Sequence, residues 1–254
     1  MNKKFKYIYG PVYSWRFGIS LGLDLLSQKE KICNFNCIYC QLGCTKKYSI
    51  KRKIYVPTEK LLNELKNLPQ LKLDYITFSG KGEPTLALNL GEAIKAIRTI
   101  RKEPILVLTN SSLIDEAFDE LLEADFVSFK IDAFSQKFFK EINSPISKIK
   151  FSRIVDGIKN FKKKYSKKIA LQIMFIKENS KYAKEISQIA KDIEPYQVQL
   201  NTPLRAFKEK AISKEEMEKI KKYFEGLNII TVYTAKIKKV EPLDKIETAK
   251  RRPN

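Results

Sequence analysis

Three cysteines, Cys33, Cys37 and Cys40, stand close together in the sequence with the spacing C-x3-C-x2-C. Three thiolates in one short loop can each bind a corner of an iron–sulfur cubane, which leaves the fourth iron without a protein ligand. An open coordination position makes a metal site reactive instead of structural. A zinc site would need a fourth ligand and usually a second C-x2-C pair, and neither that pair nor any histidine is present. The spacing therefore predicts that these cysteines hold a [4Fe–4S] cluster.

The fourth cysteine, Cys44, follows this group closely and allows three interpretations. It can be a free thiol, a hydrogen donor during turnover, or a fourth ligand of the cluster. With four ligands the chain would be a non-enzymatic electron carrier, similar to a small ferredoxin, because no iron would stay open. We favour the free thiol.

Further residues with polar side chains, and two glycines, stand at or just after the ends of short β-rich runs, where the expected strands end. They are, in chain order, Gly80, Gly82, Glu83, Asn110, Lys130 and Asp132. The carboxyl ends of parallel strands meet at one edge of a sheet, which is where ligands bind in such folds. Glycines let the backbone approach a ligand closely, and the Glu83 carboxylate complements a cation. The structural alternatives are an ordinary turn at 80–83 and a local salt bridge or helix cap at Lys130 and Asp132.

The alternation of β-rich runs with amphipathic stretches indicates parallel strands joined by crossover helices. The expected strands are 19–25, 75–78, 105–109, 126–131, 169–175, 196–200 and 229–232. The expected helices are 58–67, 90–101, one that begins at Ser112 and carries Phe118, Leu121 and Leu122, 152–164, 182–193 and 214–224. A closed eight-stranded barrel would need one more unit. We therefore predict an α/β fold, an open, partial parallel β/α barrel of about (β/α)6.

The composition limits the other possibilities. The length of 254 residues fits a single domain spanning 1–254, with a lead-in at 1–18 and a cluster-binding loop at 27–44. The absence of histidine excludes Ser-His-Asp and Cys-His catalysis in their usual forms. No apolar run approaches the ~20 residues that cross a bilayer, and the N-terminus lacks the apolar stretch of a secretory signal. We expect a cytoplasmic protein without a membrane partner.

The charge balance favours a polyanionic partner. The chain has 49 lysines and arginines against 29 acidic residues, a net charge of +20, which suits nucleic acid. Trp15 and Arg16, before the first expected strand, could stack a base or grip a phosphate, although a packed N-terminal segment is the interpretation we favour. Gln172, Asn201 and Arg205 stand at or near later strands, where we expect them to line the cavity.

The segment Cys-Asn-Phe-Asn-Cys-Ile-Tyr-Cys at 33–40 resembles the signature of the radical S-adenosylmethionine (radical SAM) superfamily. The resemblance implies that the open iron binds the methionine moiety of S-adenosylmethionine, and that reductive cleavage yields a 5′-deoxyadenosyl radical, which abstracts hydrogen from a substrate. It also implies that Tyr39 lies near the adenine and that the turn at 80–83 receives the methionine ammonium. The segment 109–111 resembles a family turn that often reaches the ribose or carboxylate. Lys81 departs from the plain Gly-Gly-Glu form of the family.

A narrower resemblance covers most of the chain. Segments at 10–12, 18–22, 41–43, 77–80 and 200–203 are similar to those of a group of uncharacterised iron–sulfur enzymes near the wyosine-type tRNA-modifying synthases. This implies tRNA or another RNA as substrate, which the basic charge would suit. The synthases carry extra N-terminal cysteines for a second cluster, and none precedes Cys33 here, so their reaction is not carried over.

Other partners are also compatible with this resemblance. The group is similar to activating enzymes, which act on a partner protein's glycine. A basic RNA-binding module with a structural cluster is a further possibility. A radical enzyme of this kind needs an external electron donor, flavodoxin- or ferredoxin-like. We favour RNA modification because of the charge.

Overall fold

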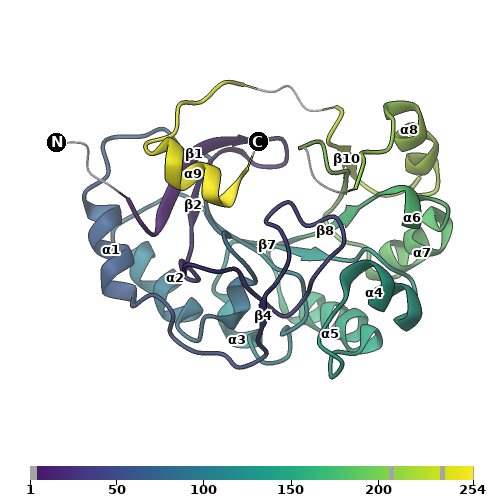
Figure 1. Ribbon diagram of the computed structural model, residues 1–254, viewed down its shortest axis with the longest axis horizontal. Helices are drawn as coiled ribbons and strands as arrows, with labels where there is room; N and C mark the ends of the chain where they lie inside the picture. The colour runs from purple at the N-terminus through teal and green to yellow at the C-terminus, as the bar shows by residue number, and fades with distance from the viewer. Residues whose placement is uncertain (1–4, 206–208, 235–237, 254) are drawn as a thin grey trace.

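The computed structural model of this chain describes residues 5–205, 209–234 and 238–253. In this part of the chain, eight strands form one curled sheet in the order β1-β2-β5-β6-β7-β8-β9-β10 (Figure 1). They are β1 Ile8–Ser14, β2 Gly18–Leu23, β5 Tyr75–Phe78, β6 Ile105–Leu108, β7 Phe126–Lys130, β8 Lys168–Met174, β9 Gln197–Asn201 and β10 Ile229–Thr231. A separate two-stranded ladder pairs β3 Ile32–Cys33 with β4 Lys47–Tyr48.

All strands from β2 to β10 pair in parallel with their neighbours, as the sequence predicted. The edge strand β1 is different, because it runs antiparallel to β2. The lead-in at 1–18 was not expected to contain a strand. The register of β1 shifts between Tyr9 and Val12, around the Gly10-Pro11 step. A proline is tolerated at a sheet edge, where its missing N–H breaks no inner ladder.

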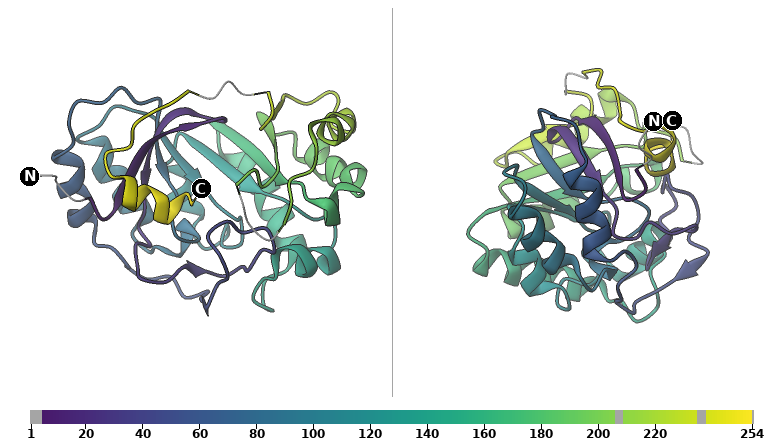
Figure 2. Two further views of the ribbon diagram at one scale, coloured as in Figure 1. Left: turned by 45° about the horizontal axis from the view of Figure 1, so that its top comes forward. Right: turned by 90° about the vertical axis from the view of Figure 1, so that its left-hand side faces the viewer.

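Helices cover the outer face of the curled sheet (Figure 2). The described helices are α1 Thr58–Lys66, α2 Leu90–Arg98, α3 Phe118–Leu122, α4 Gln136–Asn143, α5 Phe151–Lys164, α6 Lys177–Ser180, α7 Ala183–Ile193, α8 Lys214–Lys222 and α9 Lys245–Arg251, with a 3-10 turn at Pro84–Leu86. The helices α1, α2, α3, α5, α7 and α8 connect successive parallel strands, which gives the expected (β/α)6 arrangement followed by β10. The fold is a partial, open parallel β/α barrel.

Two expectations about helices are corrected. The third helix does not begin at Ser112. It begins at Phe118 after Ala117, and the Ser112 hydroxyl instead hydrogen-bonds to the Oδ1 atom of Asn110 over 2.5 Å. The helices α4, α6 and α9 were not predicted. The sequence does contain a signal for the start of α4, because serine is a preferred N-cap residue. In the structure the Ser135 hydroxyl caps this helix by accepting a hydrogen bond from the backbone N–H of Phe138.

The packing of α5 shows how the outer layer is held. Phe161 on this helix is fully buried, with its ring centroid 5.3 Å from that of Phe129 on β7 and 5.2 Å from that of Phe118 on α3. Edge-to-face contacts of this kind add to the burial of apolar area. The same apolar layer continues along the sheet through Ile76, Val107 and Leu171, so the strand ends are anchored on a rigid core. Among the described helices, none has the length and apolar character needed to span a bilayer.

The loop between β2 and α1 crosses the carboxyl edge of the sheet. At one end, the backbone N–H of Ile32 donates to the carbonyl of Lys81 over 3.0 Å, beside the turn after β5. At the other, the N–H of Ile38 donates to the carbonyl of Ile142 over 3.0 Å, on the last turn of α4. The cysteine-containing loop is therefore fixed at both ends to elements that carry polar residues.

Candidate cluster and cofactor site

One cavity of about 200 Å³ lies at the carboxyl ends of the strands, beneath the crossing loop. All three clustered cysteines line it. The other polar and aromatic lining residues include Lys31, Tyr39, Glu83, Thr109, Asn110, Ser128, Lys130 and Gln172, together with Arg16 and Gly82. The structure thus brings the cysteines together with most of the residues that the sequence placed at the strand ends.

N–H groups surround the three thiols. The ammonium of Lys31 donates to Cys40 Sγ over 3.0 Å and to the carbonyl of Gly43 over 2.9 Å. Asn143 Nδ2 lies 3.4 Å from Cys37 Sγ, and the backbone N–H of Phe35 lies 3.5 Å from Cys33 Sγ. Burial raises the pKa of the Cys33 thiol to about 12, although Lys31 opposes this shift. Donors of this kind stabilise electron-rich sulfur, and they tune the potential of an iron–sulfur cluster.

The thiols do not converge on a single point. Within the described ranges, no group of three or more His, Cys, Asp or Glu side chains is placed to hold one metal ion. A cubane does not need such a group, because its three protein ligands bind three different irons. The donor set and the cavity that all three cysteines line therefore fit an iron–sulfur cluster.

Glu83 lies fully inside the protein, at the start of the 3-10 turn. Its Oε1 atom accepts from the Thr109 hydroxyl over 2.7 Å and from the N–H and hydroxyl of Thr85. Its Oε2 atom accepts from the N–H of Asn110 over 2.6 Å. Burial raises the pKa of the Glu83 carboxyl, and these hydrogen bonds oppose the shift. Oε2 retains accepting capacity, because a carboxylate oxygen can take two donors, so it can receive a further cation from the cavity.

Gly82 is required by the crossing loop. Its φ is +152°, and a methyl group there would lie 1.6 Å from the carbonyl oxygen of Ile32. The backbone N–H of Glu83 donates to this same carbonyl over 3.1 Å. The missing side chain therefore lets the 80–83 turn pair directly with the residue before Cys33, which brings the two motifs into one site.

Hydrogen bonds fix the hydroxyl of Tyr39. Its hydroxyl donates to Asp132 Oδ2, and Asn143 Nδ2 donates to the same carboxylate oxygen over 2.9 Å. The other oxygen of Asp132 accepts from the N–H of Met174 over 2.7 Å. Asp132 is buried and does not line the cavity, so in this structure it positions Tyr39. The local salt bridge considered for it is also present, with Lys130 Nζ at 3.7 Å.

Lys130 connects Tyr39 to the opposite wall. Its ammonium lies 5.0 Å from the centre of the Tyr39 ring and donates to Gln172 Oε1 over 2.9 Å. The Nε2 atom of Gln172 is buried and has no hydrogen-bond partner within the described part of the chain. A buried unsatisfied donor is costly, and a ligand in the cavity can accept from it. Gln172 lines the cavity, as expected.

The remaining predicted residues lie elsewhere. Gly80 lines a second, larger cavity of about 410 Å³, together with Trp15, Asn201 and Arg205. Arg16 and Leu108 line both cavities, so the two adjoin. Cys44 is exposed and lines neither. Cys44 therefore lies outside the cavity that the other three cysteines share, and it lines a different cavity of about 210 Å³ together with Cys37.

Sequence reasoning missed four residues. Lys31 and Asn143 donate to cysteine sulfurs, and Arg251 and Arg252 line the second cavity. The first of these could have been found, because a lysine two residues before a cluster cysteine is a candidate donor. The other three depend on contacts between distant parts of the chain, which a single sequence does not reveal.

Comparison with known proteins identifies the superfamily of this chain. Residues 31–193 match the sequence model of the Radical SAM superfamily, so the chain belongs to that superfamily. It is a radical SAM enzyme whose substrate is unassigned.

Similar proteins share most of the length of this chain. UPF0026 protein slr1464 of Synechocystis sp. is 39% identical over 212 residues, which cover 81% of this chain and 78% of the relative. UPF0026 protein MJ1312 of Methanocaldococcus jannaschii is 34% identical over 232 residues, which cover 87% of this chain and 71% of the relative. The crystal structure of Streptococcus suis SuiB bound to S-adenosylmethionine has a TM-score of 0.59 at 16% identity. The match covers 80% of this chain and 48% of SuiB, and it confirms the fold.

Proposed function

We propose that this chain binds a [4Fe–4S] cluster and S-adenosylmethionine, cleaves the latter reductively, and uses the resulting 5′-deoxyadenosyl radical to abstract hydrogen from a substrate. The observation that carries this proposal is the cavity shared by the three cysteines and the buried Glu83 carboxylate. A cluster ligated by three cysteines keeps one open iron, and the carboxylate lies on the wall of the same cavity.

The side chains have distinct tasks in this proposal. Cys33, Cys37 and Cys40 would hold the cluster. Glu83 would accept a hydrogen bond from the amino group of S-adenosylmethionine, because its Oε2 atom has one donor in the protein. Tyr39 would offer its ring to the adenine, fixed by the hydrogen bond to Asp132. Asn110, Lys130 and Gln172 would supply the remaining polar contacts.

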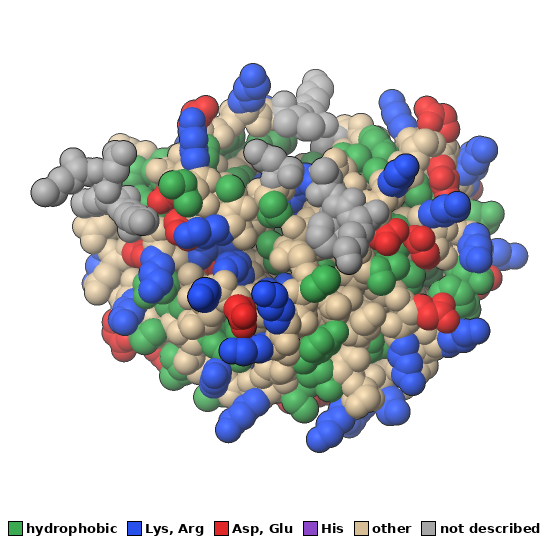
Figure 3. Space-filling view, in the orientation of Figure 1, with side chains coloured by type: hydrophobic (Ala, Val, Ile, Leu, Met, Phe, Trp, Pro, Cys, Tyr) green, Lys and Arg blue, Asp and Glu red, His purple; other side chains and the backbone are tan. Residues whose placement is uncertain are grey.

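For the substrate, we propose RNA, with tRNA as the first candidate. The support is the net charge of +20 and the wide distribution of lysine and arginine side chains on the face that includes α9 (Figure 3). A protein partner whose glycine is activated is the alternative. The electron would come from an external flavodoxin- or ferredoxin-like protein.

Anaerobic reconstitution tests the chemistry. We expect about four irons per chain, an electron paramagnetic resonance spectrum that changes when S-adenosylmethionine is added, and 5′-deoxyadenosine after reduction. Alanine at Cys33, Cys37 or Cys40 should abolish iron binding, whereas Cys44→Ala is the matched control and should retain both iron and cleavage. Loss of the cluster in Cys44→Ala would support the electron-carrier alternative. A fully loaded chain that never releases 5′-deoxyadenosine would refute the proposal.

A further inference from the structure

The second cavity has an unusual charge distribution. Four arginines line it, namely Arg16 between β1 and β2, Arg205 after β9, and Arg251 and Arg252 at the end of α9. No aspartate, glutamate or lysine is among its described lining residues. The arginines come from three segments that are far apart in the sequence, so the fold itself brings these positive charges together.

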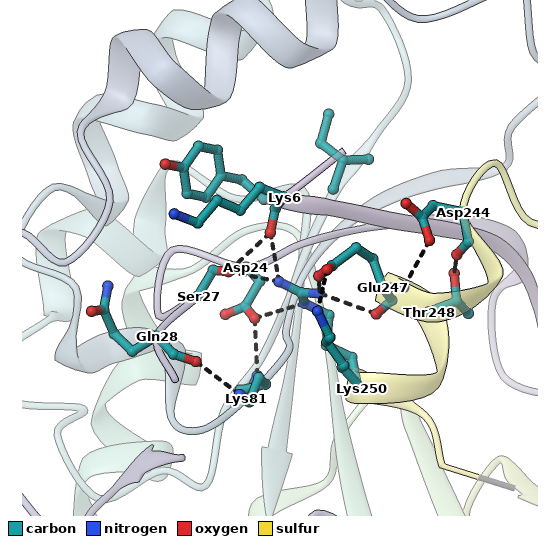
Figure 4. Close-up of polar contacts among 12 residues, drawn as sticks. Lys6, Asp24, Ser27, Gln28, Lys81, Asp244, Glu247, Thr248 and Lys250 are labelled. Carbon is teal, nitrogen blue, oxygen red and sulfur yellow. Dashed lines mark hydrogen bonds and ion pairs between the residues drawn. The ribbon is translucent and has the colours of Figure 1, made fainter. Parts of the chain in front are cut away.

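Arg251 is neutralised, but the other three arginines are not. Its guanidinium pairs with Asp24 over 2.8 Å and with Glu247 over 2.5 Å. Figure 4 labels both of these acidic residues. Arg16, Arg205 and Arg252 have no carboxylate partner in the part of the chain that the structure describes. Among the described residues, the Arg205 side chain donates only to the carbonyl of Pro253 over 3.2 Å, and the Arg16 side chain donates to Gln199 Oε1 over a long 3.4 Å.

Arg16, Arg205 and Arg252 are partly buried, and their positive charges repel one another. Burial lowers the pKa of Arg16 to about 10, and the neighbouring charge of Arg252 adds to the effect. Burial and Arg252 likewise lower the pKa of Arg205 to about 10. The Nε atom of Arg16 is buried without an acceptor among the described residues. An unsatisfied buried donor and repelling like charges both cost free energy in the folded protein. An anionic ligand would offset both costs, because it accepts hydrogen bonds and carries the opposite charge.

The number of guanidinium groups identifies the class of anion. A carboxylate carries one charge and two oxygens, which a single guanidinium fork can satisfy. A terminal phosphate carries about −1.5 to −2 charges and three acceptor oxygens, so it can use several forks at once. The hydroxyls of Ser20 and Thr77, which hydrogen-bond to each other over 2.6 Å, also line the cavity, as does the hydroxyl of Ser79, which hydrogen-bonds to that of Tyr9. Each pair keeps one hydroxyl proton that can be donated to a further oxygen.

The remaining walls suit the body of a small molecule. The aromatic rings of Tyr9, Tyr13 and Trp15 line the cavity, and the Arg16 guanidinium lies 5.6 Å from the centre of the Trp15 ring. The volume of about 410 Å³ lies within the range of ligand sites for small molecules and can hold one nucleotide. A nucleic-acid duplex could therefore enter only through a single extruded residue.

We propose that this second cavity is a phosphate-binding substrate site, in which Arg16, Arg205 and Arg252 contact the phosphate oxygens. That the ligand of this site is the substrate rests on the proposed function. It is supported by the position of the cavity, which adjoins the cysteine cavity through Arg16 and Leu108. Phosphate binding itself does not depend on it. The phosphate belongs either to a free phosphorylated compound or to a nucleotide of RNA.

Calorimetric titration of the reconstituted full-length chain tests the site. The probes are inorganic pyrophosphate, for a free phosphorylated compound, and an unmodified tRNA transcript. We expect saturable binding of at least one probe at fixed ionic strength, weakened about tenfold or more in Arg205→Gln and in Arg252→Gln. Arg153→Gln is the matched control, since it removes one exposed charge from α5 and should leave the affinity nearly unchanged. Circular dichroism verifies that each variant is folded.

The outcomes distinguish the two sources of the phosphate, and they test the phosphate site separately from the proposed function. Binding of pyrophosphate without tRNA supports a free phosphorylated compound, and the reverse supports RNA. Absence of saturable binding of both probes, or equal weakening in all three variants, would overturn the phosphate site. If the arginine variants lose binding as expected but no 5′-deoxyadenosine forms, the phosphate site stands and the proposed function fails.

Discussion

Arg251 Nε donates a hydrogen bond to Asp24 Oδ2 over 2.8 Å, and both side chains are only 1% exposed. The pair joins the C-terminal helix α9 to the end of β2, across 227 residues of sequence. Asp24 Oδ2 also accepts from the backbone N–H of Lys81 over 3.3 Å (Figure 4). The helix is thereby connected to the turn that carries Glu83, so we infer that α9 supports the candidate cofactor site from behind.

Replacing Arg251 by methionine should destabilise the protein strongly. The substitution leaves the Asp24 and Glu247 carboxylates without their shared cation, and removing one partner of a buried ion pair costs about 3–5 kcal/mol. Urea denaturation measures the loss. Lys245→Gln on the same helix is the control, because its ion pair with Glu241 is exposed on both sides and should contribute at most about 1 kcal/mol. Equal destabilisation by both changes would contradict the role assigned to Arg251.

The substitution Tyr39→Phe should distinguish the role of the hydroxyl, which positions the ring, from the packing of the ring itself. The ring is retained, but Asp132 loses the hydroxyl donor, and a hydrogen bond to a charged group contributes about 1.5–3 kcal/mol. We expect a loss of this size in unfolding free energy and weaker binding of S-adenosylmethionine, with the iron content unchanged. Tyr48→Phe, at an exposed tyrosine, should change none of these quantities. Full cofactor affinity in Tyr39→Phe would show that the hydroxyl does not position the ring.

The parallel strands were predictable because short β-rich runs alternate with amphipathic stretches, and several of these runs are buried aliphatic residues that end at a polar residue. Ile105–Leu108 followed by Thr109 is an example. The strand β1 was not, because Gly10-Pro11 interrupts its pattern and because it lies at the edge of the described sheet, beside β2. The three cysteines were recognisable because their spacing is local, and Glu83 because the turn at 80–83 resembles a segment of the radical SAM family. The contacts of Arg252 and Asn143 were not, since they form only when distant segments meet.

Asp125 gives a pH-dependent contribution to stability. Partial burial alone would raise the pKa of its carboxyl, but hydrogen bonds from Arg98 and from the N–H of Ile105, with the nearby charges of Arg98 and Lys167, lower it overall. A carboxyl with a lowered pKa in the folded state stabilises the protein above its unfolded pKa, and this stability is lost as the pH falls through the folded pKa.

Unfolding free energies of the natural chain and of Asp125→Asn, measured between about pH 3 and 7, should therefore converge at the acidic end. The difference at neutral pH should be at most about 1 kcal/mol, because the pair with Arg98 is partly exposed. Asp156→Asn, at an exposed position on α5, should give a difference that is small at every pH. A difference for Asp125→Asn that grows with acidity would have the wrong sign.

Glu83→Gln should weaken binding of S-adenosylmethionine while leaving the cluster in place. Glutamine can keep the bonds that Oε1 accepts from Thr85 and Thr109, but its amide group faces the N–H of Asn110 and carries no charge to complement an ammonium. Loss of one charge-assisted hydrogen bond predicts about a tenfold weaker affinity or more. Equilibrium dialysis with the reconstituted protein measures it, and iron analysis verifies the cluster. Glu92→Gln on the exposed side of α2 removes the same charge elsewhere and should bind normally. Unchanged affinity in Glu83→Gln would place the ammonium of the cofactor away from this carboxylate, whereas loss of iron would assign Glu83 to the support of the cysteine loop.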